Sequence, residues 1–215
     1  MRDTFLHKGM RKKLIDTLRK KGINDEDILQ AMQQLPRHFF MDTAFVKWAY
    51  TDKAFPIGNE QTISQPYTVA FQTQLLDVHP KEKILEIGTG SGYQAGILAL
   101  LGARVFTIER QEALYHKAQK LLGKLDLGNI RFFFKDGYKG LPEYAPFDKI
   151  LVTAGAETIP QKLLQQLNIG GKMVIPVGKE NQKMLVITKT GEEKYETKDY
   201  GHFRFVPFLS GVERE

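Results

Sequence analysis

The sequence predicts a doubly wound α/β fold, with a mostly parallel sheet of seven strands, helices on both faces and an N-terminal helical arm. In the second half of the chain, short apolar runs typical of strands alternate with amphipathic stretches typical of helices, which indicates a parallel sheet. The first third shows helical periodicity and then a segment punctuated by Pro and Gly. No interdomain linker separates these parts, so we expect one domain over residues 1–215.

The N-terminal arm is expected to hold two helices. Between Lys8 and Gln34, apolar residues recur at helical intervals, and Gly22 interrupts them before Asn24, which can cap the second helix. Pro36 ends this stretch. The aromatic-rich segment that follows is expected to pack against the core.

The segment 51–66 is expected to be irregular chain because of its Pro and Gly residues, and a helix is predicted over Thr68–Val78. We therefore divide the chain into an arm and ligand cover, residues 1–66, and a core, residues 67–215. Closure of the irregular segment over bound ligands is a hypothesis.

The core carries the alternating pattern. The predicted strands are Lys83–Ile87, Arg104–Glu109, Ile130–Lys135, Lys149–Thr153, Lys172–Pro176, Leu185–Lys189 and a last one near Phe203–Phe208. The helices between them are predicted over Gln94–Leu101, Gln111–Leu122 and Pro160–Gln166.

Composition narrows the class of protein. The 215 residues, 42% of them hydrophobic, suffice for a sizeable core. Because there is no cysteine, the chain holds no disulfide and no thiolate metal site, which suits the cytoplasm. The N-terminus lacks the apolar run of a secretion signal, and no stretch reaches the roughly 18 apolar residues of a membrane span. We expect a cytoplasmic monomer without membrane partners.

The formal charge of +6 raises the question of nucleic-acid binding. The basic residues are spread among acidic ones, with a local cluster at residues 11–13 and 19–21. At helical spacing such a cluster is more often a solvated face than a binding surface. We therefore expect no nucleic-acid partner.

The most informative motif is a glycine-rich turn after the first core strand, where Glu86 precedes Gly88, Gly90 and Gly92. In doubly wound sheets, ligands bind beyond the carboxyl ends of the central strands, and glycine lets backbone amides approach them. The alternative is a dinucleotide site, but its Gly-x-Gly-x-x-Gly pattern places the third glycine one residue later. Glu86 would also repel a pyrophosphate, whereas it can accept hydrogen bonds from an ammonium group. The turn therefore favours S-adenosylmethionine.

Two further acids follow the next two predicted strands. Glu109 lies where an acid accepts hydrogen bonds from both ribose hydroxyls. Dinucleotide sites and S-adenosylmethionine sites share this signal. Asp136 could receive the adenine amino group, with Gly137 leaving room for the ring. Any one of these acids could instead be solvated or cap a helix, but three at successive strand ends favour a cofactor site.

The turn and the acids resemble the generic motifs of methyltransferases. A more specific match includes the sequence Thr-Ile-Ser-Gln-Pro and comprises the segments Pro56–Tyr67, Pro160–Leu164, Gly170–Gly178 and Arg204–Pro207. In that order these segments are similar to bacterial protein-L-isoaspartate O-methyltransferases, from about Met10 to Gly211. The resemblance implies a Rossmann-like core over residues 67–215.

The resemblance also implies a repair reaction. The family methylates the free α-carboxylate of L-isoaspartyl residues in damaged proteins and peptides, using S-adenosyl-L-methionine, releasing S-adenosyl-L-homocysteine and needing no metal. The methyl ester cyclises to a succinimide, whose hydrolysis returns part of the material to aspartate. Because a carboxylate is already anionic at neutral pH, no strong general base is required, and alignment and desolvation should provide most of the rate.

Ser64 is the expected catalytic residue, because the resemblance matches it to the active-site serine of the family. No histidine stands in a triad relation to it, so a covalent nucleophile is not expected. By position alone, Ser64 could instead cap the helix beginning near Pro66, and both roles can coexist. The expected substrate-binding residues are Ser64, Gln65, Pro66, Val206 and Pro207. The expected cofactor-binding residues are Gln61, Thr62, Ile63, Glu86, Gly88, Thr89, Gly90, Ser91, Gly92, Glu109, Arg110, Asp136 and Gly137.

Two rival functions remain. A methyltransferase acting on nucleic acid or a small molecule would share the cofactor half, but it would need a target-specific element such as an Asn/Asp-Pro-Pro-Tyr/Phe motif, which the sequence lacks. A non-catalytic module could bind the cofactor only as a sensor.

Overall fold

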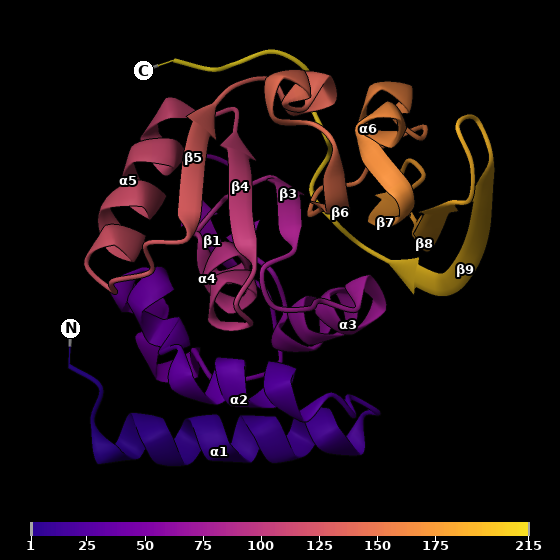
Figure 1. The fold of residues 1–215 in the computed structure, drawn as a ribbon. Helices are drawn as coiled ribbons and strands as arrows, with labels where there is room; N and C mark the ends of the chain where they lie inside the picture. Colours follow the sequence, from indigo (N-terminus) through magenta and orange to yellow (C-terminus); the bar gives the residue numbers. More distant parts are fainter. Residues whose placement is uncertain (1, 215) are drawn as a thin grey trace.

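The computed structural model describes residues 2–214, shown in Figure 1. The strands are β1 (Phe55–Gly58), β2 (Gln61–Ile63), β3 (Lys83–Ile87), β4 (Arg104–Glu109), β5 (Ile130–Phe134), β6 (Phe147–Val152), β7 (Leu167–Val177), β8 (Gln182–Lys189) and β9 (Tyr195–Phe203). The α-helices are α1 (Phe5–Lys20), α2 (Glu26–Gln34), α3 (Pro66–Leu76), α4 (Tyr93–Leu100), α5 (Glu112–Gly123) and α6 (Gln161–Gln165). Short 3-10 helices are η1 (Arg37–Phe40), η2 (Thr43–Trp48), η3 (Gly137–Lys139) and η4 (Pro142–Tyr144).

The large sheet has seven strands in the order β5-β4-β3-β6-β7-β8-β9. The strands from β5 to β7 run parallel, whereas β8 pairs antiparallel with both β7 and β9. The chain moves outward from β3 to β5 and then crosses to β6 on the other side of β3, so the order of the parallel strands reverses there. This topology confirms the predicted doubly wound, mostly parallel sheet.

Alternation along the strands places an apolar layer on each face of the sheet. Ile84 and Leu151 belong to the layer that packs under helices α1 to α5. Leu85 and Ile150 belong to the other layer, which packs against α6 and the segment of η3 and η4. Full burial of each such side chain contributes about 1.5–3 kcal/mol. Within residues 2–214, no helix combines the length and apolarity needed to traverse a lipid bilayer.

Helix α2 begins one residue later than predicted, because its cap is Asp25 rather than Asn24. The Asp25 carboxylate accepts hydrogen bonds from the backbone N–H groups of Asp27 (3.0 Å) and Ile28 (3.2 Å). The N–H of Asn24 instead donates to the side-chain oxygen of Gln74 on α3, at 2.8 Å. The Asp25 carboxylate thus accepts two hydrogen bonds from the free backbone N–H groups of the first turn. Asn24, one residue earlier in the chain, is less well placed to accept them.

The segment 51–66 is not irregular as predicted, because it contains the hairpin of β1 and β2. The turn residues Asn59 and Glu60 both have positive φ, at 51° and 54°. This conformation suits a tight hairpin turn, but Glu seldom adopts it. The sequence therefore lacks the Asn-Gly pair from which such a turn is usually predicted. The amide of Gln111 donates to the carbonyl oxygen of Asn59 at 3.2 Å and holds the hairpin tip near the start of α5.

The last strand is also displaced from its prediction. It spans Tyr195–Phe203 rather than Phe203–Phe208, and it forms an exposed edge of the sheet beside β8. Because most of its residues face solvent, its polar sequence lacks the apolar alternation from which the other strands were predicted. The chain then returns to the carboxyl edge of the sheet, where Gly155 and Pro207 form a parallel bridge.

Candidate active site

A cleft opens at the carboxyl ends of β3, β4 and β6, at the point where the strand order reverses. Ligands bind at this switch point in doubly wound sheets. The cleft encloses about 860 Å³ of empty space, part of it open to solvent. It is lined by Gln61, Thr62, Ile63, Ser64, Val69, Ile87, Gly88, Thr89, Gly90, Ser91, Tyr93, Gln94, Ile108, Glu109, Arg110, Gly137, Thr153, Ala154, Val206, Pro207, Phe208 and Leu209.

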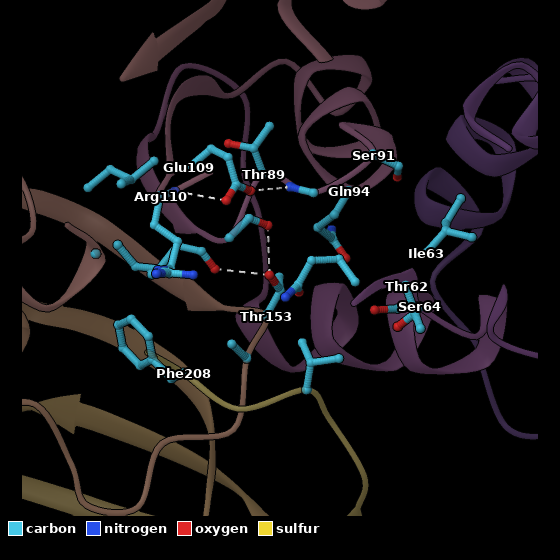
Figure 2. Close-up of a pocket in the computed structure, with 18 of the residues that line it drawn as sticks. Thr62, Ile63, Ser64, Thr89, Ser91, Gln94, Glu109, Arg110, Thr153 and Phe208 are labelled. Atoms are coloured by element: carbon cyan, nitrogen blue, oxygen red, sulfur yellow. Dashed lines mark hydrogen bonds between the residues drawn. The ribbon is translucent and has the colours of Figure 1, made fainter. Parts of the chain in front are cut away.

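The glycine-rich turn forms one wall of the cleft (Figure 2). Gly88 has a φ of 95°, and a Cβ atom there would lie 2.5 Å from Thr153 Oγ1. The Thr153 hydroxyl lies 2.9 Å and 2.8 Å from the carbonyl oxygens of Ile87 and Gly88, so it ties the turn to the end of β6. Only glycine permits this approach. Four predicted turn residues line the cleft, Gly88, Thr89, Gly90 and Ser91, whereas Gly92 is the N-cap of α4 and does not.

Glu109 lies at the end of β4 and faces the cleft (Figure 2). Its carboxylate accepts hydrogen bonds from the backbone N–H groups of Gly90 (2.8 Å), Arg110 (2.8 Å) and Gln111 (3.0 Å). Burial raises the pKa of the Glu109 carboxyl, and these bonds oppose the rise. The group is therefore fixed in direction, and it keeps lone pairs that can accept bonds from hydroxyl groups.

Glu86 lies beneath the cleft, not on the wall where the sequence placed it. It shares the sheet face of Ile84, its side chain is fully buried, and it is absent from the cleft lining. Its Oε2 accepts a hydrogen bond from the Thr107 hydroxyl at 2.6 Å. The Thr107 hydroxyl in turn lies 2.6 Å from the hydroxyl of Thr89. Among the described residues, two threonines link Glu86 to the cleft by hydrogen bonds, and the predicted direct contact with an ammonium group has no support in this geometry.

Burial raises the pKa of the Glu86 carboxyl to about 8; the bond from Thr107 opposes this rise and the charge of Glu109 adds to it. The other carboxyl oxygen, Oε1, is buried and has no hydrogen-bond partner among the described residues. An ionised carboxylate in such surroundings is costly, so the proton is retained near neutral pH.

Replacement of Glu86 by Gln is expected to flatten the pH dependence of stability. Because the folded-state pKa of Glu86 exceeds the ordinary value of 4.5, folding retains a proton, and the free energy of unfolding falls as the pH rises from 4.5 toward about 8. At about 1.36 kcal/mol for each unit of pKa, the fall should amount to a few kcal/mol in the wild type and vanish in the variant. Denaturant titrations across this pH range measure it, and identical slopes in both proteins would contradict the assignment.

The predicted adenine end of the cleft contains Gly137 but not Asp136. The Asp136 side chain accepts a hydrogen bond from the N–H of Tyr138 at 3.0 Å and so caps η3. The rings of Tyr138 and Phe208 stack at 4.0 Å between centroids, with an interplanar angle of 10°. Phe208 therefore presents a fixed aromatic surface to this end of the cleft, which the sequence did not predict.

The other end of the cleft is formed by β2 and the residues after it, with Thr62 and Ser64 across from Phe208 in Figure 2. Gln61 and Ile63 also line this end. The alternative role of Ser64 as a helix cap is wrong, because the N-cap of α3 is Gln65.

Two of the predicted substrate-binding residues, Gln65 and Pro66, do not line the cleft; Pro66 is the buried first residue of α3. The other three, Ser64, Val206 and Pro207, do line it. Val206 and Pro207 belong to the segment that follows β9. They are held there because Gly155 donates to the carbonyl oxygen of Val206 and accepts from the N–H of Phe208, both at 2.8 Å.

Several lining residues escaped prediction because they come from other segments of the chain. Thr153 and Ala154 follow β6, and Leu209 follows the bridge at Pro207. Gln94 lies on the first turn of α4, and in the sequence it is indistinguishable from an ordinary helix residue. Only the position of Thr153 directly after a predicted parallel strand gave a usable signal.

Among residues 2–214, one group of side chains has the spacing of metal donors, Asp3, His7 and His38 in the helical arm. None of the three lines the cleft. Arg11 forms an ion pair with Asp3 at 2.9 Å, and the Tyr50 hydroxyl lies 2.7 Å from His38 Nδ1. Asp3 and His38 therefore already have partners in the protein.

The fold occurs in solved methyltransferase structures. A protein-L-isoaspartate O-methyltransferase matches with a TM-score of 0.85 and 27% identity, covering 94% of this chain and 67% of that one. A Plasmodium falciparum protein described as a protein-L-isoaspartate O-methyltransferase, in complex with S-adenosyl-L-homocysteine, matches with a TM-score of 0.83 and 25% identity, covering 93% and 98%. The fold and the site define an S-adenosylmethionine-dependent methyltransferase.

Sequence relatives specify the family. The family model for protein-L-isoaspartate(D-aspartate) O-methyltransferase matches residues 9–213. The protein-L-isoaspartate O-methyltransferase of Christiangramia forsetii is 54% identical over 209 residues, covering 97% of this chain and 98% of the relative. That of Cytophaga hutchinsonii is 55% identical over 210 residues, covering 97% and 95%. The chain belongs to the protein-L-isoaspartate(D-aspartate) O-methyltransferase family, which confirms the resemblance found in its sequence.

Proposed function

We propose that this protein transfers a methyl group from S-adenosyl-L-methionine to the free α-carboxylate of L-isoaspartyl residues in damaged proteins and peptides. One observation carries the proposal: in a chain of this family, the cleft at the switch point contains both the fixed carboxylate of Glu109 and the hydroxyl-bearing Ser64. The methyl ester cyclises with loss of methanol to a succinimide, and hydrolysis returns part of the damaged residue to aspartate.

The cleft fits S-adenosylmethionine at three places. Glu109 presents the acceptor that two ribose hydroxyls require. The turn at Gly88–Ser91 offers backbone amides in place of bulky side chains. At Gly137, a Cβ atom would lie 2.5 Å from Ile87 Cγ2 and 3.0 Å from the ring of Phe208, so only glycine leaves room beside that ring. Gln61, Thr62, Ile63 and Arg110 complete the proposed cofactor contacts.

When bound, S-adenosylmethionine supplies an activated methyl group on a sulfonium. An isoaspartyl carboxylate is ionised at neutral pH, so its oxygen bonds to the methyl carbon without a general base, while the carbon–sulfur bond breaks and its electron pair stays on sulfur. The proposed part of Ser64 is to donate a hydrogen bond to that carboxylate and hold it in line. Such alignment can supply several kcal/mol of the barrier.

The β1–β2 hairpin and the C-terminal tail are proposed to limit the access of water to the cleft. The side-chain amide of Gln111 lies 3.2 Å from the carbonyl oxygen of Asn59 and 3.4 Å from Glu213 Oε2. Arg110 adds an ion pair to Glu213 at 2.9 Å. Hairpin and tail therefore meet beside the proposed ribose site, where exclusion of water strengthens the electrostatic contacts. Closure of the 51–66 segment over both ligands stays a prediction.

The peptide is proposed to bind in an extended form at the open side of the cleft, bordered by Ser64 on one side and by Val206 and Pro207 on the other, with Gln65 and Pro66 supporting Ser64 from outside the cleft lining. Backbone hydrogen bonds would hold it, because damaged sites occur in many sequence contexts. We therefore expect broad tolerance of the neighbouring side chains.

Incorporation of labelled methyl groups tests the function. The protein is expected to label an isoaspartyl peptide and not the matching aspartyl peptide. Labelling of neither peptide, with tight binding of S-adenosylhomocysteine, would favour a non-catalytic sensor, and labelling of nucleic acid would favour the other rival. The monomeric state, the lack of nucleic-acid and membrane partners and the cytoplasmic location stay predictions.

A further inference from the structure

The segment that carries Ser64 is held by a residue that is distant in sequence. Helix α3 starts at Pro66, and its N-cap residue, Gln65, makes no side-chain capping bond. The free N–H of Tyr67 in the first turn instead donates to Asp52 Oδ1 at 2.8 Å. Asp52 lies in the loop after η2, so it caps α3 from outside the helix.

The second oxygen of Asp52 holds the residue next to Ser64. Asp52 Oδ2 accepts a hydrogen bond from the side-chain amide of Gln65 at 3.0 Å and forms an ion pair with Lys21 at 2.6 Å. The Asp52 side chain is only 10% exposed, whereas that of Lys21 is 46% exposed. One nearly buried carboxylate therefore fixes the chain on both sides of Pro66.

A buried cation strengthens the case that this carboxylate is constrained. Arg37 is fully buried and attracts Asp52 electrostatically. Its Nη2 donates to the carbonyl oxygen of Lys53, the neighbour of Asp52, at 3.4 Å. The loop that presents Asp52 is thus anchored from the core as well as from α1.

The hydroxyl of Ser64 makes no hydrogen bond with any other described residue, so its direction depends on the backbone that bears it. The carboxylate of Asp52 restrains that backbone, because it accepts hydrogen bonds from the side-chain amide of Gln65 and from the backbone N–H of Tyr67. We propose that Asp52 is a positioning residue for methyl transfer, which orients Ser64 toward the isoaspartyl carboxylate without touching either substrate. This inference rests on the proposed function of Ser64.

The test compares variants by steady-state methylation of an isoaspartyl peptide. Asp52→Ala is expected to lower kcat about 10- to 100-fold, because small misplacements of a positioning group have effects of that size. The KM for S-adenosylmethionine should stay within about twofold, since no cofactor contact is lost. Asp52→Asn keeps an acceptor for the N–H of Tyr67 and should recover most of the turnover. Lys21→Met removes the exposed ion pair and the contact of Lys21 Nζ with the Tyr67 ring, 5.6 Å from its centroid, but keeps both hydrogen bonds to Asp52, and should leave kcat unchanged.

A matched control separates positioning from helix capping. Asp25→Ala removes the equivalent carboxylate cap of α2, which is outside the cleft, and should lower thermal stability comparably without lowering kcat. If Asp52→Ala does not fold, a loss of kcat in Gln65→Leu at unchanged KM for S-adenosylmethionine supports the proposal instead. Unchanged kcat in Asp52→Ala, or an equal loss in Asp25→Ala, overturns it. Failure of the proposed function is distinguishable, because wild-type protein would then not methylate the peptide.

Discussion

Replacement of Ser64 by Ala is expected to lower kcat for an isoaspartyl peptide about 100-fold, the effect of removing one preorganised hydrogen-bond donor. The hydroxyl lies at the end of the cleft opposite Phe208 and makes no hydrogen bond with another described residue that its loss would break. The dissociation constant of S-adenosylhomocysteine should therefore not change. Rapid-quench turnover and calorimetric binding of S-adenosylhomocysteine measure the two quantities.

Ser91→Ala provides the matched control for Ser64, because it removes a hydroxyl from the same cleft at the glycine-rich turn. In the wild type, the Ser91 hydroxyl accepts a hydrogen bond from the N–H of Tyr93 at 3.2 Å. Its loss should therefore disturb the glycine-rich turn and raise the KM for S-adenosylmethionine. If Ser64→Ala keeps wild-type turnover, Ser64 has no part in orienting the carboxylate.

Replacement of Glu109 by Ala is expected to weaken S-adenosylhomocysteine binding on the order of 100-fold, because two hydrogen bonds from ribose hydroxyls to a charged acceptor are lost. The change also releases the backbone N–H groups of Gly90, Arg110 and Gln111, which would loosen the glycine-rich turn. Affinity alone therefore does not separate lost ribose contacts from a displaced turn.

A ligand comparison isolates the ribose contribution of Glu109. The wild type should bind adenosine more tightly than 2′,3′-dideoxyadenosine, and the Glu109→Ala variant should show almost no such preference, as in a double-mutant cycle. Equal preference for adenosine in both proteins would place the ribose elsewhere.

The core of the fold was predictable because its signals are local. β3 and β4 were predicted with their observed bounds, since both are short apolar runs that end at a turn or an acid. β9 was misplaced because an exposed edge strand needs no apolar alternation. The β1–β2 hairpin was missed because the two central residues of its turn, Asn59 and Glu60, are not the Asn-Gly pair that usually signals such a turn.

The candidate site was predictable where a single segment forms it. The turn after β3 and Glu109 lie in the cleft as the motif placed them. The depth of Glu86 depends on which face of β3 its side chain takes, and that face is set by packing under the helices. Phe208 and Thr153 enter the cleft through contacts between distant segments, and no spacing along the chain encodes those contacts.

The central claim is that one cleft aligns the methyl donor with a damaged backbone carboxylate, and a crystal structure with S-adenosylhomocysteine and an isoaspartyl peptide tests it most directly. We expect the ribose at Glu109, the adenine between Gly137 and Phe208, and the isoaspartyl carboxylate within hydrogen-bond distance of Ser64 Oγ. A nucleoside bound away from the Gly88–Ser91 turn, or a peptide carboxylate out of reach of both Ser64 and the sulfur atom, would contradict the account.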